Sequence, residues 1–255
     1  MPHPSTTPLE IAREQLLSAA TGWAPQQEIC GVSNALGRVL ATEQISSVDL
    51  PQTDNVAVDG YAVEAAFLAA HPDHLFKVVG TARAGHPFAG TAAPGEAVRV
   101  FTGAVMPEGP DCVIMHEDCQ ISDVGIICGK QLKSGANMRP AGENIAAGET
   151  LAAKGVFLGA ADIGQLAAAG LKQIPVFRPL KIALMSTGDE LVQSGEVRKA
   201  GQIFDSNRPM LAALCRQQGG QLTDCGIIRD DRASLSAAWR DALGHCDVII
   251  SSGGA

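Results

Sequence analysis

The last third of the chain alternates strands and helices, and this alternation constrains the fold most. Helical spacing of apolar residues runs from Asn207 to Gly219, and again from Leu235 to Gly244. Three strand-like apolar runs flank these helices: KIALMS (181–186), LTDCGII (222–228) and DVIISSGG (247–254). The first run is continuously apolar, as is typical of a strand buried on both faces. This order predicts a parallel sheet with crossover helices, which is half of an open α/β fold.

The helix expected after SSGG does not follow in these 255 residues. Three strands with two crossovers would leave a long unpaired edge. We therefore expect 181–255 to be the N-terminal half of a truncated α/β domain.

A polar cluster follows each of these three strands: STGDEL (186–191), RDD (229–231) and SSGG (251–254). Because the carboxyl ends of parallel strands meet at one edge of a sheet, the three clusters are predicted to converge on one crevice. Their hydroxyls and backbone amides could receive a phosphate without added positive charge. The predicted ligand-binding residues are Thr187, Gly188, Asp189, Ser251, Ser252, Gly253 and Gly254.

The acidic residues of these clusters predict a cation beside the phosphate. Glu190, Asp230 and Asp231 would need a positive partner, and Mg²⁺ held between carboxylates and phosphate is the economical choice. A structural role is the alternative interpretation for each of these clusters. Asp230 or Asp231 could cap the next helix, Asp189-Glu190 could be a solvated turn, and Gly253-Gly254 could be an ordinary strand-to-helix turn.

The first 180 residues have a different character. Between 51 and 145, short β-rich runs alternate with turn signals and predict an inserted all-β domain. The flanks, 1–50 and 146–180, are expected to form one helical domain into which it is inserted. Thr7-Pro8 predicts a helix start with a capping box, and Ser33 a second short helix that runs through Leu40.

The run TDNVAVDGYAV (53–63) embeds Asp54 and Asp59 among small apolar residues. Its turn formers lie too close together to predict a regular helix or a clean strand. The two acids either tie down a buried turn or act on a bound ligand.

Composition excludes several classes of function. A net charge of −8 argues against nucleic acid or an anionic membrane as partner, and no apolar run is long enough for a transmembrane helix. The N-terminus resembles no signal peptide. The seven cysteines form no CxxC pair, which favours reduced thiols in a cytoplasmic protein over a disulfide framework or a cysteine metal site.

Several of these runs together resemble the molybdopterin molybdenumtransferase family, of the MoeA and gephyrin E-domain type. The matches occur in the family's order and cover nearly all of the chain after residue 7. They are ALGRVLA (35–41), LPQTDNVAVDGYAV (50–63), AGHPFAG (84–90), FTGAVMPEGPDCVIMHE (101–117), MRPAGENIAAGETLAAKG (138–155), ALMSTGDEL (183–191), GQIFDSN (201–207), GIIRDD (226–231) and DVIISSGG (247–254).

The resemblance implies a fold and a reaction. The fold is an elongated helical domain with an inserted β-rich domain, followed by a molybdopterin-binding α/β domain. The reaction inserts molybdate into adenylylated molybdopterin and releases AMP, with Mg²⁺ as cofactor. The resemblance also implies a homodimer, in which Asp59 reaches the cleft of the partner. Asp59, Glu190 and Asp230 lie at family positions linked with activity, and Glu190 and Asp230 would hold the metal.

Two positions depart from the family pattern. Val56 stands where the family usually has serine, and Asn144 where it usually has aspartate. These changes leave open a second function, a pterin-binding and dimerising scaffold without turnover. A third, a nucleotide-processing enzyme that reuses the α/β domain, is disfavoured by the DNVAVDGYA and FTGAVMPEG runs.

Overall fold

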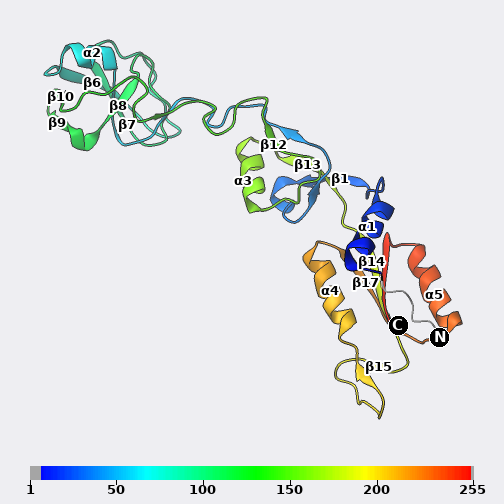
Figure 1. The fold of residues 1–255 in the computed structure, drawn as a ribbon. Helices are drawn as coiled ribbons and strands as arrows, with labels where there is room; N and C mark the ends of the chain where they lie inside the picture. Colours follow the sequence, from blue (N-terminus) through cyan, green and yellow to red (C-terminus); the bar gives the residue numbers. More distant parts are fainter. Residues whose placement is uncertain (1–6, 254–255) are drawn as a thin grey trace. The chain divides into compact units, whose positions relative to one another are not determined.

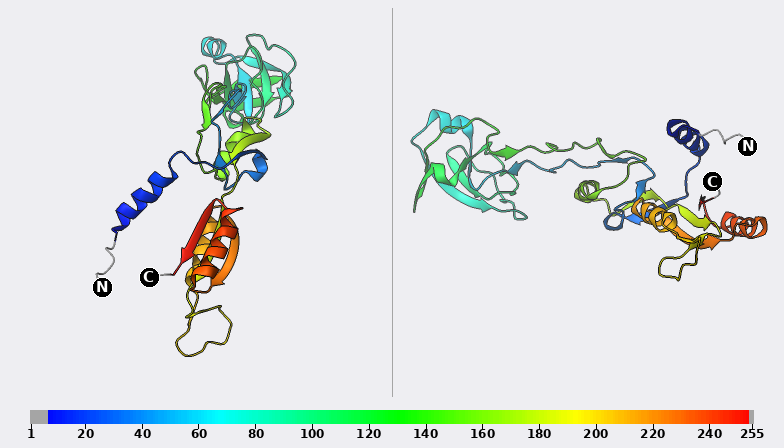
Figure 2. Two further views of the ribbon diagram at one scale, coloured as in Figure 1. Left: turned by 90° about the vertical axis from the view of Figure 1, so that its right-hand side faces the viewer. Right: turned by 60° about the horizontal axis from the view of Figure 1, so that its bottom comes forward.

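The apolar runs of the last third form a three-stranded parallel sheet in the order β17-β14-β18, as predicted (Figure 1). Helices α4 and α5 cover opposite faces of this sheet (Figures 1 and 2). Central strand β14 is therefore buried along almost its whole length. In chain order the elements are β14 (Lys181–Thr187), α4 (Asn207–Gln217), β17 (Gln221–Ile228), α5 (Arg232–Leu243) and β18 (Val248–Ser252).

The side chains of β14 alternate between the two helices because successive residues of a strand point to opposite faces. Ala183 and Met185 are fully buried and pack with Ala242 of α5. Ile182 and Leu184 point to the other face, which α4 covers. Between β14 and α4 the chain makes a small parallel pair, β15 (Leu191–Val192) with β16 (Ile203–Phe204).

The structure is a computed structural model that describes residues 7–253, and it divides into two compact units. The first unit contains the chain up to 42, residues 154–163 and the chain from 172 onward; the second contains 43–153 and 164–171. The three-domain division expected from the sequence stays a prediction.

An antiparallel sheet of three strands organises the N-terminal part of the first unit. Its order is β1-β13-β2, with β1 (Gln27–Gly31), β13 (Gln173–Phe177) and β2 (Val39–Leu40). The second helix predicted through Leu40 is wrong. Only a single 3₁₀ turn forms, η1 (Val32–Asn34), because the backbone of 37–40 pairs with 156–158 instead.

The flanking segments are less helical than expected. They contain helices α1 (Leu9–Ala20) and α3 (Ala160–Ala168), and otherwise strands, including the pair β3 (Gln44–Ile45) and β12 (Thr150–Ala152). The predicted capping box of α1 is also wrong, since Pro8 is the N-cap and no side chain caps the helix. Strand pairing, rather than helix packing, therefore holds the two flanks together.

The second unit is built on a six-stranded mixed sheet in the order β8-β5-β7-β6-β10-β9, which agrees with the predicted β-rich character. The pair β4 (Asn55–Val56) and β11 (Met138–Arg139), the helix α2 (Ala65–Ala70) and the 3₁₀ turn η2 (His116–Asp118) complete it. The sheet strands are β5 (Gly60–Val63), β6 (Leu75–Ala82), β7 (Glu96–Val100), β8 (Cys112–Met115), β9 (Cys119–Ser122) and β10 (Gly125–Cys128).

Strand β5 corrects the reading of the TDNVAVDGYAV run, because Gly60–Val63 is a clean strand with all four residues buried. Tyr61 and Val63 belong to one apolar core and Ala62 to another, so the strand is covered on both faces. Gly60 allows the close approach of β8, since a Cβ there would lie 1.9 Å from the carbonyl oxygen of Ile114. The end of the run is apolar because 60–63 form a strand inside the sheet, between β7 and β8.

Within residues 7–253, no helix has the length and apolar character needed to cross a membrane.

Candidate functional site

A small cavity of about 150 Å³ lies at the carboxyl ends of β14 and β18. Four of the predicted site residues line it, namely Thr187, Glu190, Ser252 and Gly253. The segment between β15 and α4 supplies the opposite wall, with Leu191, Ile203, Phe204, Asp205, Ser206 and Asn207. The predicted convergence of the first and third clusters is therefore confirmed.

Two close contacts join the walls of this cavity. The side-chain amide of Asn207, the first residue of α4, donates to Ser252 Oγ at 3.1 Å. Gly253 has a φ of +117° and lies directly against Thr187, since a Cβ built on it would be 2.1 Å from the Thr187 carbonyl oxygen. Only glycine fits this approach without displacing the backbone.

Asp205 anchors the wall that precedes α4. Its side chain is almost fully buried, and it accepts hydrogen bonds from the backbone N–H and the Nε of Arg208 at 3.1 and 2.9 Å. Burial alone would raise the pKa of Asp205, but the bonds from Arg208 outweigh burial and hold that pKa below its ordinary value. Arg208 also donates to both oxygens of Asp224 on β17. This network ties the start of α4 to the sheet.

The second polar cluster lies at the neighbouring edge and does not line the cavity. The backbone N–H of Asp230 approaches Asp189 Oδ1 at 3.5 Å, which places the loops after β14 and β17 side by side. Asp231 is the N-cap of α5: its carboxylate accepts from the N–H and the hydroxyl of Ser234 at 2.8 and 2.7 Å. These bonds lower the pKa of Asp231, chiefly through the Ser234 N–H. The interpretation as a helix cap is therefore correct for Asp231. Asp230 remains the candidate for a role in ligand binding.

Glu190 presents an uncommitted carboxylate to the cavity. The carboxylate lies over Gly188, close enough that a Cβ at Gly188 would be 2.5 Å from Glu190 Oε2. Within residues 7–253, no three His, Cys, Asp or Glu side chains gather to hold a metal. Mg²⁺ is commonly held by one or two carboxylates together with substrate phosphates and waters. Glu190 offers one such carboxylate in the cavity lining, whereas Asp230 does not line the cavity.

Gly188, Asp189 and Ser251 of the predicted set do not line the cavity. Ser251 is exposed on β18 and pairs in register with Met185. Gly254 lies outside the described residues.

The sequence interpretation missed Asp205, Ser206 and Asn207. The signal for them was the DSN run immediately before a predicted helix, because helix starts gather polar side chains and free N–H groups.

Asp59 belongs to the second unit, so it is not among the residues of this cavity. Its Oδ1 accepts two hydrogen bonds from Thr102, from the backbone N–H and from the hydroxyl, both at 2.8 Å. The backbone bond above all, then the hydroxyl bond, lowers the pKa of this exposed carboxyl. Asp54 behaves differently, since its carboxylate accepts the N–H of Ala141 and ties down a turn.

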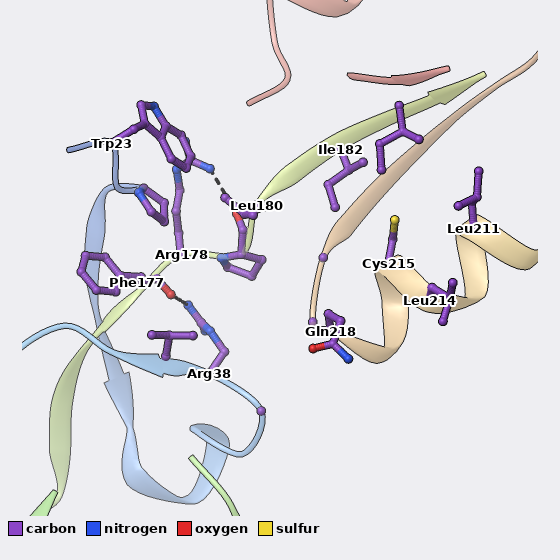
Figure 3. Close-up of a pocket in the computed structure, with 17 residues that line it drawn as sticks. Trp23, Arg38, Phe177, Arg178, Leu180, Ile182, Leu211, Leu214, Cys215 and Gln218 are labelled. Carbon is purple, nitrogen blue, oxygen red and sulfur yellow. Dashed lines mark hydrogen bonds between the residues drawn. The ribbon is translucent and has the colours of Figure 1, made fainter. Parts of the chain in front are cut away.

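A larger cavity, about 510 Å³, lies elsewhere in the first unit (Figure 3). It adjoins Ile182 at the amino end of β14 and the Gly219-Gly220 turn before β17, and it is mainly apolar, with Trp23 and Leu214 in its lining. It is therefore at the opposite end of the strands from the predicted clusters.

Two family profiles match this chain. The family profile "MoeA N-terminal region (domain I and II)" matches residues 7–170, and "Probable molybdopterin binding domain" matches residues 183–255. The chain belongs to the MoeA family. The second match contains the cavity-lining residues Thr187, Glu190, Asn207 and Ser252.

Relatives and solved structures agree with this assignment. The chain is 34% identical over 247 residues to a molybdopterin molybdenumtransferase of Haemophilus influenzae, covering 96% of this chain and 60% of that protein. It is 39% identical over 231 residues to a Nostoc protein of the same name, covering 89% and 53%. The crystal structure of a molybdopterin biosynthesis MoeA protein of Pyrococcus horikoshii matches with a TM-score of 0.82 and 34% identity, covering 98% of this chain and 64% of that one. The chain thus spans somewhat more than half the length of these curated relatives.

The two departures from the MoeA pattern have structural counterparts. Val56 is 1% exposed in β4, where it packs in an apolar core of the second unit, so no hydroxyl is presented there. Asn144 accepts a hydrogen bond from Arg139 at 3.1 Å, and Arg139 also pairs with Glu143 at 2.7 Å. The amide thus keeps an acceptor oxygen at position 144 without a negative charge.

Proposed function

We propose that this protein acts in molybdenum cofactor biosynthesis, inserting molybdate into adenylylated molybdopterin with release of AMP. The observation that carries the proposal is the cavity at the carboxyl ends of β14 and β18, within the segment that matches a molybdopterin-binding domain. The activity belongs to proteins nearly twice as long as the matched segment, so it is proposed here for the whole protein.

The chain's own residues divide the work. The hydroxyls of Thr187 and Ser252 and the amide of Gly253 receive the terminal phosphate of the pterin, and Asn207 fixes the Ser252 hydroxyl. Gly188 and Asp189, which follow Thr187, and Ser251 and Gly254, which flank Ser252 and Gly253 in the sequence, are proposed to complete the ligand contacts. Mg²⁺ held by Glu190 and Asp230 would neutralise phosphate charge.

Asp59 is proposed to act from the second unit of a partner subunit in a homodimer. Its Oδ1 is fixed by Thr102, so the carboxylate has a set orientation and stays ionised near neutral pH. An ionised, oriented carboxylate can accept a proton or position a polar group of the substrate. A cytoplasmic location, where molybdate and reduced dithiolene coexist, suits this chemistry.

The test is molybdate-dependent release of AMP from adenylylated molybdopterin by the purified chain in the presence of Mg²⁺. We expect release that needs both molybdate and Mg²⁺. Pterin binding without any release would contradict the enzyme proposal for this chain.

A second function, a pterin-binding and dimerising scaffold, is favoured by one observation. The buried Val56 and the neutral Asn144 remove a hydroxyl and a carboxylate at family positions of the second unit. The double variant Val56→Ser, Asn144→Asp separates the two functions. AMP release by the variant but not by the parent chain supports the scaffold. Equal AMP release by the parent chain and the variant supports the enzyme.

A further inference from the structure

The hairpin of β9 and β10 brings two cysteines opposite each other. The strands are antiparallel and joined by a two-residue turn, 123–124, with Ser122 opposite Gly125. From that turn the register places Cys119 directly opposite Cys128. The proposed function assigns no role to Cys119 or Cys128.

Their position in the ladder is of the type that brings side chains closest. Antiparallel ladders alternate hydrogen-bonded pairs with non-hydrogen-bonded pairs, whose Cα atoms are about 4.5 Å apart. The next pair outward is hydrogen-bonded, because the N–H of Gly129 donates to the carbonyl of Asp118 at 2.9 Å. Cys119 and Cys128 therefore form a non-hydrogen-bonded pair. Its spacing lies within the range of about 4.4–6.8 Å between Cα atoms that a disulfide requires.

The two thiols differ in access and in acidity. Cys128 is 5% exposed in the core of the second unit, whereas Cys119 is half-buried at its margin. A hydrogen bond from the Cys128 thiol lowers the pKa of Cys119, and the same bond, with burial, raises the pKa of Cys128. The accessible thiol of Cys119 is thus also the more readily ionised of the two.

The neighbouring thiol of Cys112 provides a contrast. It is fully buried in the same core and donates to the carbonyl of Val63 at 3.4 Å. Burial raises the pKa of Cys112 to about 12. Cys112 is therefore an unreactive thiol close to a reactive pair.

We propose that Cys119 and Cys128 form a reversible intramolecular disulfide by exchange with a low-molecular-weight disulfide. The Cys119 thiolate attacks the small disulfide, forms a mixed disulfide and releases one small thiolate. The Cys128 thiol then loses its proton to solvent and attacks the Cys119 sulfur, which releases the second small thiolate. The protein is oxidised by two electrons, and the small disulfide is reduced to two thiols.

The bridge would lie beside the segment that carries Asp59. Cys119 follows η2 directly, and the N–H of His116 in η2 donates to the carbonyl of Asp59 at 3.1 Å. His116 also receives a hydrogen bond from Arg99, which stacks over Tyr61. A disulfide between Cys119 and Cys128 would thus restrict the movement of β9, the strand that follows η2.

Thiol counting on the intact chain tests the proposal. The protein is equilibrated with mixtures of reduced and oxidised glutathione, its free thiols are alkylated, and the products are measured by mass spectrometry. We expect each chain to lose two of its seven free thiols without forming a disulfide to another chain, and we expect peptide mapping to join 119 to 128. Excess dithiothreitol should restore all seven.

Three variants distinguish the steps. Cys128→Ser should stop at a mixed disulfide of glutathione on Cys119. Cys119→Ser should leave Cys128 unmodified, because Cys128 is buried. Cys112→Ser, the matched control in the same core, should form the bridge as the parent chain does. Retention of all seven thiols in fully oxidised glutathione, or a bridge between other cysteines, would overturn the proposal.

Discussion

The side-chain amide of Asn207 donates to the hydroxyl of Ser252 at 3.1 Å, and this bond joins the first residue of α4 to the last residue of β18. Strand β14 is the central strand of the sheet, pairs with β18 and packs against α4, so the contact lies beside the end of this central strand. The bond thus helps to keep the two hydroxyls that we propose to contact phosphate, those of Thr187 and Ser252, on the same side of the cavity.

The first prediction concerns this contact. Asn207→Ala should weaken binding of adenylylated molybdopterin about tenfold, because a hydrogen bond that orients a ligand-binding hydroxyl is worth about 1–1.5 kcal/mol. Titration calorimetry measures the change. Gln217→Ala, an exposed position in the last turn of the same helix, is the matched control. An equal loss in both variants would contradict the role of Asn207.

The second prediction concerns Gly253, where both conformation and space exclude a side chain. Gly253→Ala should lower the melting temperature and abolish pterin binding, because its Cβ would meet the Thr187 carbonyl at 2.1 Å in addition to the strain of a positive φ. Gly195→Ala is the control, since Gly195 has a φ of +93° but no atom near its Cβ position. The control should lose only about 1 kcal/mol of stability and keep binding.

Much of the parallel sheet β17-β14-β18 could be predicted from the sequence, because the patterns that indicate each element lie within that element. Continuous apolar runs and helical spacing indicate β14, α4, β17, α5 and β18, and the parallel direction of the strands then places their polar carboxyl ends at one edge. The capping role of Asp231 was one of two open readings, and only the hydrogen bonds to Ser234 decided it.

The rest depended on contacts between distant segments. The 3₁₀ turn at Val32–Asn34 replaced a predicted helix because 37–40 pairs with 156–158, over a hundred residues away. Strand β5 was not predicted because turn-forming residues flank it in the sequence. In the structure β7 and β8 pair with it on either side and stabilise it. The DSN run indicates a helix start at Asn207, but the contact of Asn207 with Ser252, 45 positions later, depends on the fold.

The third prediction concerns Asp59. Asp59→Asn should abolish AMP release while the melting temperature stays within about 2 °C, because the exposed side chain loses its charge but keeps an acceptor for Thr102. The pKa of Asp59 is lower in the folded protein than its ordinary value, so activity that depends on its ionised form should persist above that ordinary value and fall only at lower pH. Unchanged release in the variant would exclude a catalytic role for Asp59.

The fourth prediction concerns the ion pair of Arg178 and Asp247, which joins the end of β13 to the start of β18. Two guanidinium hydrogens donate to the carboxylate at 2.6 and 2.7 Å, and the N–H of Lys181 donates at 2.8 Å. Asp247→Asn should therefore cost about 1–2 kcal/mol of unfolding free energy at pH 7, a figure reduced for partial solvent exposure. Urea denaturation measures it.

The same pair sets a pH dependence. The Arg178 hydrogen bonds lower the pKa of Asp247 from 3.8 to about 2. Its stabilising contribution should be fully present above pH 3.8 and disappear as the pH falls through about 2. The stability difference between the parent chain and Asp247→Asn should shrink in that window, and a constant difference down to pH 2 would contradict this assignment.

The last prediction separates the adjacent aspartates Asp230 and Asp231, either of which could cap α5 on the residue pattern alone. Asp231→Ala should lower the stability of the chain by about 1 kcal/mol, because it removes the N-cap of α5 and leaves the Ser234 N–H without its acceptor. Asp230→Ala should leave the melting temperature unchanged, since the Asp230 contact to Asp189 uses the backbone N–H. In contrast, Asp230→Ala should raise the Mg²⁺ concentration needed for half-maximal AMP release, whereas Asp231→Ala should not. Thermal unfolding and a Mg²⁺ titration on the same two proteins give both readouts, and the reverse pattern would assign the metal to Asp231.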